Sequence, residues 1–275
     1  GRVFHGEDEV YAFDLLPAYC EQLPVIVIAR LLGVPEEMAP RLLAWSHAMV
    51  AMYQARRDRA AEDAAAEAAA EFAAFLRGLV EDRRARPADD LISRLVAAED
   101  AGDRLSTEEL IATCVLLLNA GHEATVHTLG NGVKAILEHA AQDALAPGRI
   151  EATVEEILRF DPPLHMFTRW AYEEAEVAGH RFARGDRIAL LLGAANRDPA
   201  RWHAPERFDP ARAVRPNAAF GAGLHFCVGA PLARLELRIG LSTLFARCPE
   251  LRLAAPPRYA DLYHFHGLER LAVHR

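Results

Sequence analysis

Residues 220–229 read Phe-Gly-Ala-Gly-Leu-His-Phe-Cys-Val-Gly, so that Cys227 stands among three glycines. A helix is predicted from about Pro231, because proline in a first turn costs no hydrogen bond. Glycine tolerates positive φ and lets the backbone approach a flat ligand closely. The partial positive charge at a helix start favours a thiolate over a thiol. The stretch therefore predicts a loop that presents a soft anionic sulfur as a ligand.

The alternative for a lone cysteine is a small buried hydrophobe in a loop, and here the surrounding pattern decides against it. The spacing Phe-x-x-Gly-x-His-x-Cys-x-Gly resembles the cysteine loop of the cytochrome P450 family at each fixed position. The resemblance implies haem b as the cofactor, Cys227 as the ligand of its iron, and His225 as a partner of a haem propionate. It also implies that the haem is contacted by Phe220, Gly221 and Gly229.

A long buried helix is predicted upstream of this loop. Ser106 and Glu109 form a capping-box pattern, which marks a helix start. The helix can continue without proline to about His139, or ~50 Å at ~1.5 Å per residue. A helix of this length would cross a whole domain.

The middle of this helix reads Ala-Gly-His-Glu-Ala-Thr at residues 120–125. Gly121 could be a packing notch, with the Thr125 hydroxyl bonding back to its carbonyl. The stretch is also similar to the distal motif of the family, Ala/Gly-Gly-x-Asp/Glu-Thr-Thr. The resemblance implies that Glu123 and Thr125 deliver protons during oxygen activation. The first threonine of the motif is replaced here by Ala124, and the later hydroxyl is taken as the relay. The residues expected beside the haem are Ala120, Gly121, Ala124 and Thr125.

A zinc-protease helix is a weaker alternative for the same stretch. His122, Glu123 and His127 superficially resemble the HExxH pattern. Histidines five positions apart on a helix are rotated by ~140°, whereas the zinc pattern needs both on one face. The spacing excludes this site.

Three arginines are assigned supporting roles. Glu156 and Arg159 lie at i and i+3, which alone would indicate an ordinary surface ion pair. The family has a Glu-x-x-Arg at this place, and the segment 205–208 resembles the one that supplies its second arginine. By resemblance Glu156, Arg159 and Arg207 lock the scaffold behind the haem loop.

Arg169 is expected to bind a haem propionate, since its planar fork suits a carboxylate.

Substrate-pocket walls are expected on the turn before Arg169 and on a loop near the C-terminus. Core packing is the alternative for each residue. The positions assigned by resemblance are Leu164, His165, Met166, Phe167, His264 and Phe265.

The fold class expected is mainly α with a smaller β portion, in a single domain over residues 1–275. By resemblance this is the C-terminal two-thirds of the cytochrome P450 fold, without its N-terminal segment. The pattern predicts helices at 58–84, 91–99, 153–160 and 231–246, a break at 101–103, and a hairpin of 177–182 with 187–192.

Composition narrows the function classes. The formal net charge is −8, which disfavours nucleic-acid binding. The longest apolar run, near Cys114 to Leu118, is far short of the ~20 residues of a membrane span, and no export signal is seen. A cytoplasmic location is expected. The four cysteines form no CxxC pair, so neither a disulfide framework nor a zinc ribbon is indicated.

The resemblance implies a monooxygenase that inserts one oxygen atom of O2 into a small apolar organic substrate. Electrons would come from a ferredoxin or a similar protein, docking on a basic face that includes Arg212, Arg215 and Arg234. Two alternatives remain. One is a non-catalytic or degenerate haem-binding fragment. The other is a peroxide-driven peroxygenase, which the pair Glu123 and Thr125 disfavours.

Overall fold

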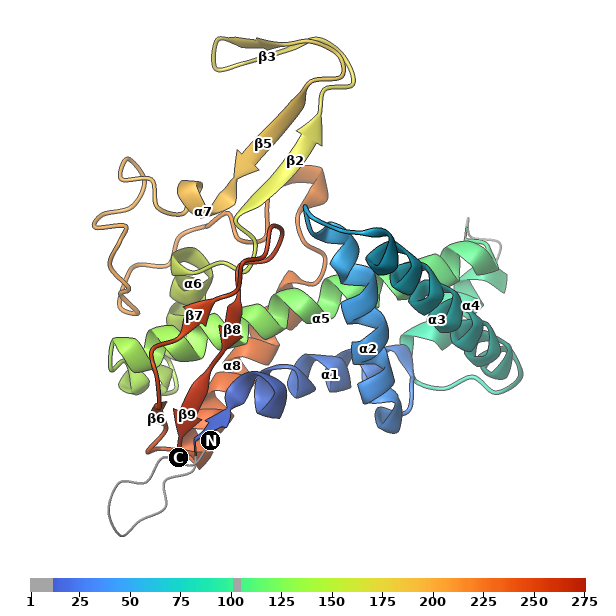
Figure 1. Cartoon of the computed structure of the whole chain (residues 1–275), viewed down its shortest axis with the longest axis horizontal. Coiled ribbons are helices and arrows are strands. Elements are labelled where there is room, and N and C mark those ends of the chain that lie inside the picture. Colours follow the sequence, from blue (N-terminus) through green and yellow to red (C-terminus); the bar gives the residue numbers. More distant parts are fainter. Residues whose placement is uncertain (1–11, 101–104) are drawn as a thin grey trace.

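The computed structural model describes residues 12–100 and 105–275, so the break expected at 101–103 lies outside the described residues. Figure 1 shows a mainly helical protein with small sheets, crossed by one long helix, α5 (Thr107–Glu138). Ser106 and Glu109 form the predicted capping box at its start. The helix ends at Glu138, one residue before the predicted end.

The helices predicted at 58–84, 91–99, 153–160 and 231–246 correspond to α3, α4, α6 and α8, whereas α1, α2 and α7 have no counterpart among the predicted ranges. Asp58 caps α3 by accepting a hydrogen bond from the Ala61 amide, and Pro231 lies in the first turn of α8. The α-helices are α1 Gln22–Leu32, α2 Ala39–Val50, α3 Arg59–Ala85, α4 Leu91–Asp100, α6 Ile150–Phe160, α7 Leu192–Ala195 and α8 Ala230–Arg247. Short π or 3₁₀ turns occur at Leu16–Cys20, Glu36–Met38, Ala51–Tyr53, Gln142–Leu145 and Gly223–His225.

Two hydrophobic cores meet along α5. Its first part, Leu110 to Leu118, packs into a core formed with α1 to α4. Its last part, Val126 to Ile136, packs into a second core with α6 and α8. The motif at 120–125 lies between the two cores, and none of its residues belongs to either core.

The predicted hairpin is wrong in its pairing. β3 (Ala175–Val177) pairs with β4 (His180–Phe182), whereas β5 (Arg187–Leu191) pairs with β2 (Met166–Trp170). Ala178 and Gly179 both have positive φ, at 50° and 79°. Two such residues make the tight turn that suits hairpin strands, so residues 177–182 contain a turn and are not one strand. The β3–β4 hairpin extends beyond the β2–β5 ladder (Figure 1).

The first and last described strands belong to one three-stranded sheet. β1 (Phe13–Asp14) pairs with β9 (Ala272–His274), which also pairs with β6 (Arg252–Leu253). β7 (Arg258–Tyr259) pairs with β8 (Leu268–Arg270) beside α5. Among the described residues, no helix has the length and apolar character to cross a membrane.

Candidate cofactor site

The cysteine loop is held in shape by its own backbone. The Cys227 amide donates to the Phe220 carbonyl at 3.0 Å, which closes the loop immediately before α8. Gly221 and Gly223 both have φ of 69°, a conformation that other residues rarely adopt. These two glycines therefore permit the turn that brings Cys227 to the N-terminal end of α8, as the sequence predicted.

The loop presents an exposed apolar surface around a half-buried thiol. Leu224 is 96 % exposed, Val228 88 % and Phe226 49 %. Uncovered apolar side chains in one short loop indicate a binding surface. A sulfur donor at a helix N-terminus within an apolar surface suits a large flat group whose metal takes a thiolate ligand. The residues present thus fit a haem.

The motif of α5 divides between two faces of the helix. Ala120 is exposed, and Ala124, four positions on, shares its face and is partly exposed. Thr125 is rotated by ~140° from Ala120, is 6 % exposed, and donates its hydroxyl to the Gly121 carbonyl at 3.4 Å. Gly121, which is exposed, lies between Ala120 and Thr125 around the helix, and the contacts of these residues with haem stay predictions.

Gly121 is exposed on one side and meets the Ile28 side chain of α1 on the other. A Cβ at Gly121 would lie 3.3 Å from the Ile28 side chain of α1. The absent side chain lets α1 approach α5 closely. Ala124 therefore occupies the open face next to Ala120, and the Thr125 hydroxyl is directed back into the helix.

Glu123 is buried in a group of imidazoles. Its side chain is 9 % exposed, with one oxygen 3.3 Å from His47 Nε2 and the other 3.6 Å from His127 Nε2. Burial raises the pKa of Glu123, which nearby His47 partly offsets. Burial also lowers the pKa of His127 to about 4. Sequence reasoning missed His47, because 76 residues separate it from Glu123.

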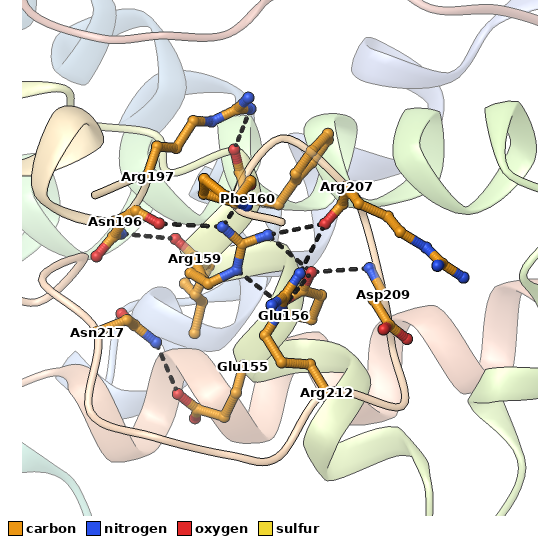
Figure 2. A network of polar contacts seen from close by, with 12 residues as sticks. Glu155, Glu156, Arg159, Phe160, Asn196, Arg197, Arg207, Asp209, Arg212 and Asn217 are labelled. Atoms are coloured by element: carbon orange, nitrogen blue, oxygen red, sulfur yellow. Dashed lines mark hydrogen bonds and ion pairs between the residues drawn. The ribbon is translucent and has the colours of Figure 1, made fainter. Parts of the chain in front are cut away.

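A second buried carboxylate, Glu156 of α6, lies between two guanidinium groups (Figure 2). Arg159 donates to both Glu156 oxygens, at 2.7 and 2.8 Å. Arg212 Nε lies 3.1 Å from one of them, and the Asp209 amide donates to the other at 2.8 Å. Glu156 is 3 % exposed and Arg159 1 %. We call these four residues the Glu156 network.

The predicted role of Arg207 is corrected by this geometry. Its exposed side chain points away from Glu156 in Figure 2, and its backbone carbonyl accepts from Arg159 at 3.1 Å and from Arg212 at 3.0 Å. Arg212 supplies the second guanidinium. The motif match identified the correct segment of the chain. Within that segment, the irregular backbone brings Arg212, five residues after Arg207, into contact with Glu156.

Arg159 also binds the coil that leads to the cysteine loop. Its Nη1 donates to the carbonyls of Asn196 and Pro205, at 3.0 and 2.9 Å. Further along, Glu155 of α6 accepts from Asn217 at 3.1 Å and pairs with Arg234 of α8. Helix α6 thereby anchors the coil at both ends of its path to Cys227.

Two of the three arginines expected on the basic docking face, Arg212 and Arg234, are used in these ion pairs. The Arg212 side chain is 13 % exposed and binds Glu156, and Arg234 binds Glu155. Arg215 is exposed.

His225 and Arg169 are exposed too, and Arg169 donates to the Thr168 carbonyl at 2.9 Å. Their contacts with haem propionates stay predictions.

The predicted pocket residues come together in one aromatic group. Leu164 and Phe265 form an isolated antiparallel bridge. The Phe265 ring lies 5.3 Å from the His127 ring of α5, which joins this group to the distal motif. Phe167 contacts His264 edge to face. His165 stacks on His266 at 3.8 Å, and Met166 is partly buried in β2.

Comparison with known proteins identifies relatives over almost the whole chain. The Cytochrome P450 family model matches residues 150–251. The polyketide biosynthesis cytochrome P450 PksS of Bacillus subtilis is 39 % identical, over 94 % of this chain and 65 % of its own length. The biotin biosynthesis cytochrome P450 of the same organism is 37 % identical, over 98 % and 70 %.

Solved structures of cytochrome P450 proteins are similar to this chain as well. P450BioI, crystallised with an acyl carrier protein carrying hexadec-9Z-enoic acid, superposes with a TM-score of 0.90 at 36 % identity. The similarity covers 96 % of this chain and 69 % of that one. The chain thus spans about two thirds of the length of such proteins, in agreement with the expected fold class.

The Glu156 network gives a prediction that separates Arg212 from Arg207. Glu156→Ala should lower the free energy of unfolding by about 3–5 kcal/mol, because it leaves two buried guanidiniums without their carboxylate. Arg212→Ala should also destabilise the protein, whereas Arg207→Ala should stay within about 0.5 kcal/mol of wild type. Urea unfolding of the full-length protein measures these differences. A larger loss from Arg207→Ala than from Arg212→Ala would contradict the assignment.

Proposed function

Because the chain belongs to the cytochrome P450 family, we propose that it is the catalytic part of a haem-thiolate monooxygenase acting on a small apolar organic substrate. The reaction would insert one oxygen atom of O2, with electrons from a ferredoxin or a similar redox protein. The observation that carries the proposal is the half-buried Cys227 thiol at the start of α8, in an apolar glycine loop.

Haem, when bound, would supply the activation of dioxygen. The protein would contribute the ligand, the pocket and the protons. Cys227 would bind the iron through its thiolate. Arg169 and His225 are the candidates for binding the haem carboxylates.

The distal residues would make space and hold a proton. Ala120 and Ala124 have the smallest side chains, and they leave room on the face where a ligand would lie. Glu123 keeps a proton to higher pH than an ordinary carboxyl, since burial raises its pKa. The aromatic group around Phe265 and Phe167 would exclude water and contact an apolar substrate.

A peroxide-driven reaction is the second candidate, and one observation favours it. Ala124 replaces the first threonine of the motif, and the Thr125 hydroxyl donates to the Gly121 carbonyl at 3.4 Å. This removes part of the reason for preferring the oxygen-dependent route. Glu123 still provides a buried acid beside that face.

Turnover of the full-length protein tests the proposal. With NADPH, a surrogate ferredoxin system and a panel of apolar compounds, we expect a product that carries one atom of labelled O2. Hydrogen peroxide alone should support a lower rate. Product formed faster with peroxide than with the electron-transfer system would favour the second candidate. Absence of product from both would contradict monooxygenase function.

The two faces of α5 give a sharper prediction. Thr125→Ala should raise the ratio of peroxide released to substrate oxidised by about twofold or more, because it removes the hydroxyl that the motif assigns to proton delivery. Ala124→Thr should change that ratio, because it adds a hydroxyl on the open face. Product and peroxide are quantified per NADPH consumed. An unchanged ratio in Thr125→Ala would remove this hydroxyl from proton delivery.

A further inference from the structure

Helix α2 contacts the middle of α5 through polar side chains. The Ser46 hydroxyl lies 3.4 Å from His122 Nδ1, and Asn119 donates to the Met49 sulfur at 3.6 Å. Ser46 and His122 are both fully buried. His122 Nε2 has no hydrogen-bond partner among the described residues. A buried polar atom without a partner is costly, so this imidazole needs an explanation beyond packing.

Glu123 completes a group of three side chains that converge between the two helices. Its Oε1 lies 3.3 Å from His47 Nε2 and 3.8 Å from His122 Nδ1. Ligand atoms of the three residues all lie within 4.8 Å of one another. Within the described part of the chain, no group donates a hydrogen bond to Glu123. Two imidazoles and a carboxylate thus converge without hydrogen bonds to one another, which leaves their lone pairs available to a cation.

The distances suit a tetrahedral cation such as Zn²⁺. Zinc holds nitrogen and oxygen ligands at ~2.0–2.1 Å, which places neighbouring ligand atoms roughly 3.3–3.5 Å apart. The separation of His47 Nε2 from Glu123 Oε1, 3.3 Å, already meets this requirement. The His47 side chain is 51 % exposed, so it can move to bring the other separations into range. Its exposure also gives the cation a path from solvent.

The chemistry of the group favours the same ion. Two neutral imidazoles and one carboxylate are a ligand set that zinc uses where it keeps an open fourth position. Burial lowers the pKa of His122 to about 3, with nearby His47 and His127 adding to the shift, so its ring is neutral at neutral pH. The rings of His47 and His122 have centroids 5.8 Å apart and are tilted by 43°, so they are not stacked. Their nitrogens can therefore approach one ion.

A second group of possible ligands is less suitable. Asp161, His165 and His266 also have ligand atoms within 4.8 Å of one another. The Asp161 carboxylate already accepts from Tyr259 and lies 2.9 Å from His266 Nε2 in a hydrogen bond. The rings of His165 and His266 stack at 3.8 Å. Hydrogen bonding and stacking thus already use these side chains.

We propose that His47, His122 and Glu123 form a Zn²⁺ site that bridges α2 and α5. His47 Nε2, His122 Nδ1 and the Glu123 carboxylate bind the cation, and water takes the fourth position. This site differs from the zinc-protease helix that the spacing excludes, because its second histidine comes from α2 and His127 is not a ligand. Bound Zn²⁺ holds the carboxylate that the distal motif assigns to proton delivery, so it inhibits turnover. This last consequence rests on the proposed function.

The first test measures binding without turnover. In the full-length haem-loaded protein, Zn²⁺ is titrated by calorimetry at neutral pH. His47→Gln and Glu123→Gln should each weaken the tight site by about 100-fold or more, since the loss of even an outer partner of a metal site costs about 10–100-fold. His180→Gln, which changes an exposed histidine on β4, is the matched control and should bind as wild type. Absence of tight binding, or tight binding that both site variants retain, would overturn the proposal.

Two further measurements locate the ion. X-ray absorption at the zinc edge should show nitrogen and oxygen ligands at about 2.0–2.1 Å and no sulfur, which separates this site from a cysteine site. His165→Gln removes a ligand of the second group and should leave Zn²⁺ affinity unchanged. Tight binding that is lost in His165→Gln and retained in His47→Gln would place the ion at the second group and overturn the assignment.

The last test measures inhibition. Zn²⁺ at a concentration that fills the site should lower kcat of wild type about tenfold or more, because it withholds a proton-delivering acid. In the same Zn²⁺, His47→Gln should keep the rate that it shows without the metal. Equal inhibition of both proteins would contradict an inhibitory site at His47. If wild type binds Zn²⁺ through His47 and Glu123 but turns over no substrate, the metal site stands and the monooxygenase proposal fails.

Discussion

The buried carboxylate of Glu156 is the constraint on which the cysteine loop depends. Taking a carboxylate and two guanidiniums out of water costs several kcal/mol for each ion, so the arrangement persists only when all the partners are in place. Arg159 and Arg212 belong to different segments, one helical and one irregular. The requirement to pair Glu156 therefore holds the coil before the loop against α6. The coil before the cysteine loop has little regular structure, so ion pairs hold it in place where a strand would be held by the backbone hydrogen bonds of a sheet.

Helix α5 provides the opposite support. Its two ends are buried in separate hydrophobic cores, so its middle can carry small and polar residues without losing its place. Gly121 lets α1 approach, Ala120 and Ala124 leave an open face, and Glu123 lies among histidines of α2 and α5. Packing at the two ends of one helix thus makes room for polar chemistry at its centre.

Much of this could be predicted from the sequence, where the signals are local. The capping box at Ser106, the helix from about residue 58 and the glycines before Cys227 each depend on a few neighbouring residues, and the structure agrees with them. Errors arose where distant segments meet. The second arginine that pairs with Glu156 is Arg212 rather than Arg207, and β5 pairs with β2, while the residues expected to be its partner strand form the β3–β4 turn. His47 could not be connected to Glu123, since no local pattern links α2 to the middle of α5.

The central claim is that the sulfur of Cys227 binds haem iron. The most direct measurement is the absorption spectrum of the reduced, carbon-monoxide-treated full-length protein. The account predicts the strongly red-shifted Soret band of a thiolate-ligated haem, its loss in Cys227→His, and its retention in Cys248→Ala. A protein that takes up no hemin, or a red-shifted band that survives in Cys227→His, would contradict it.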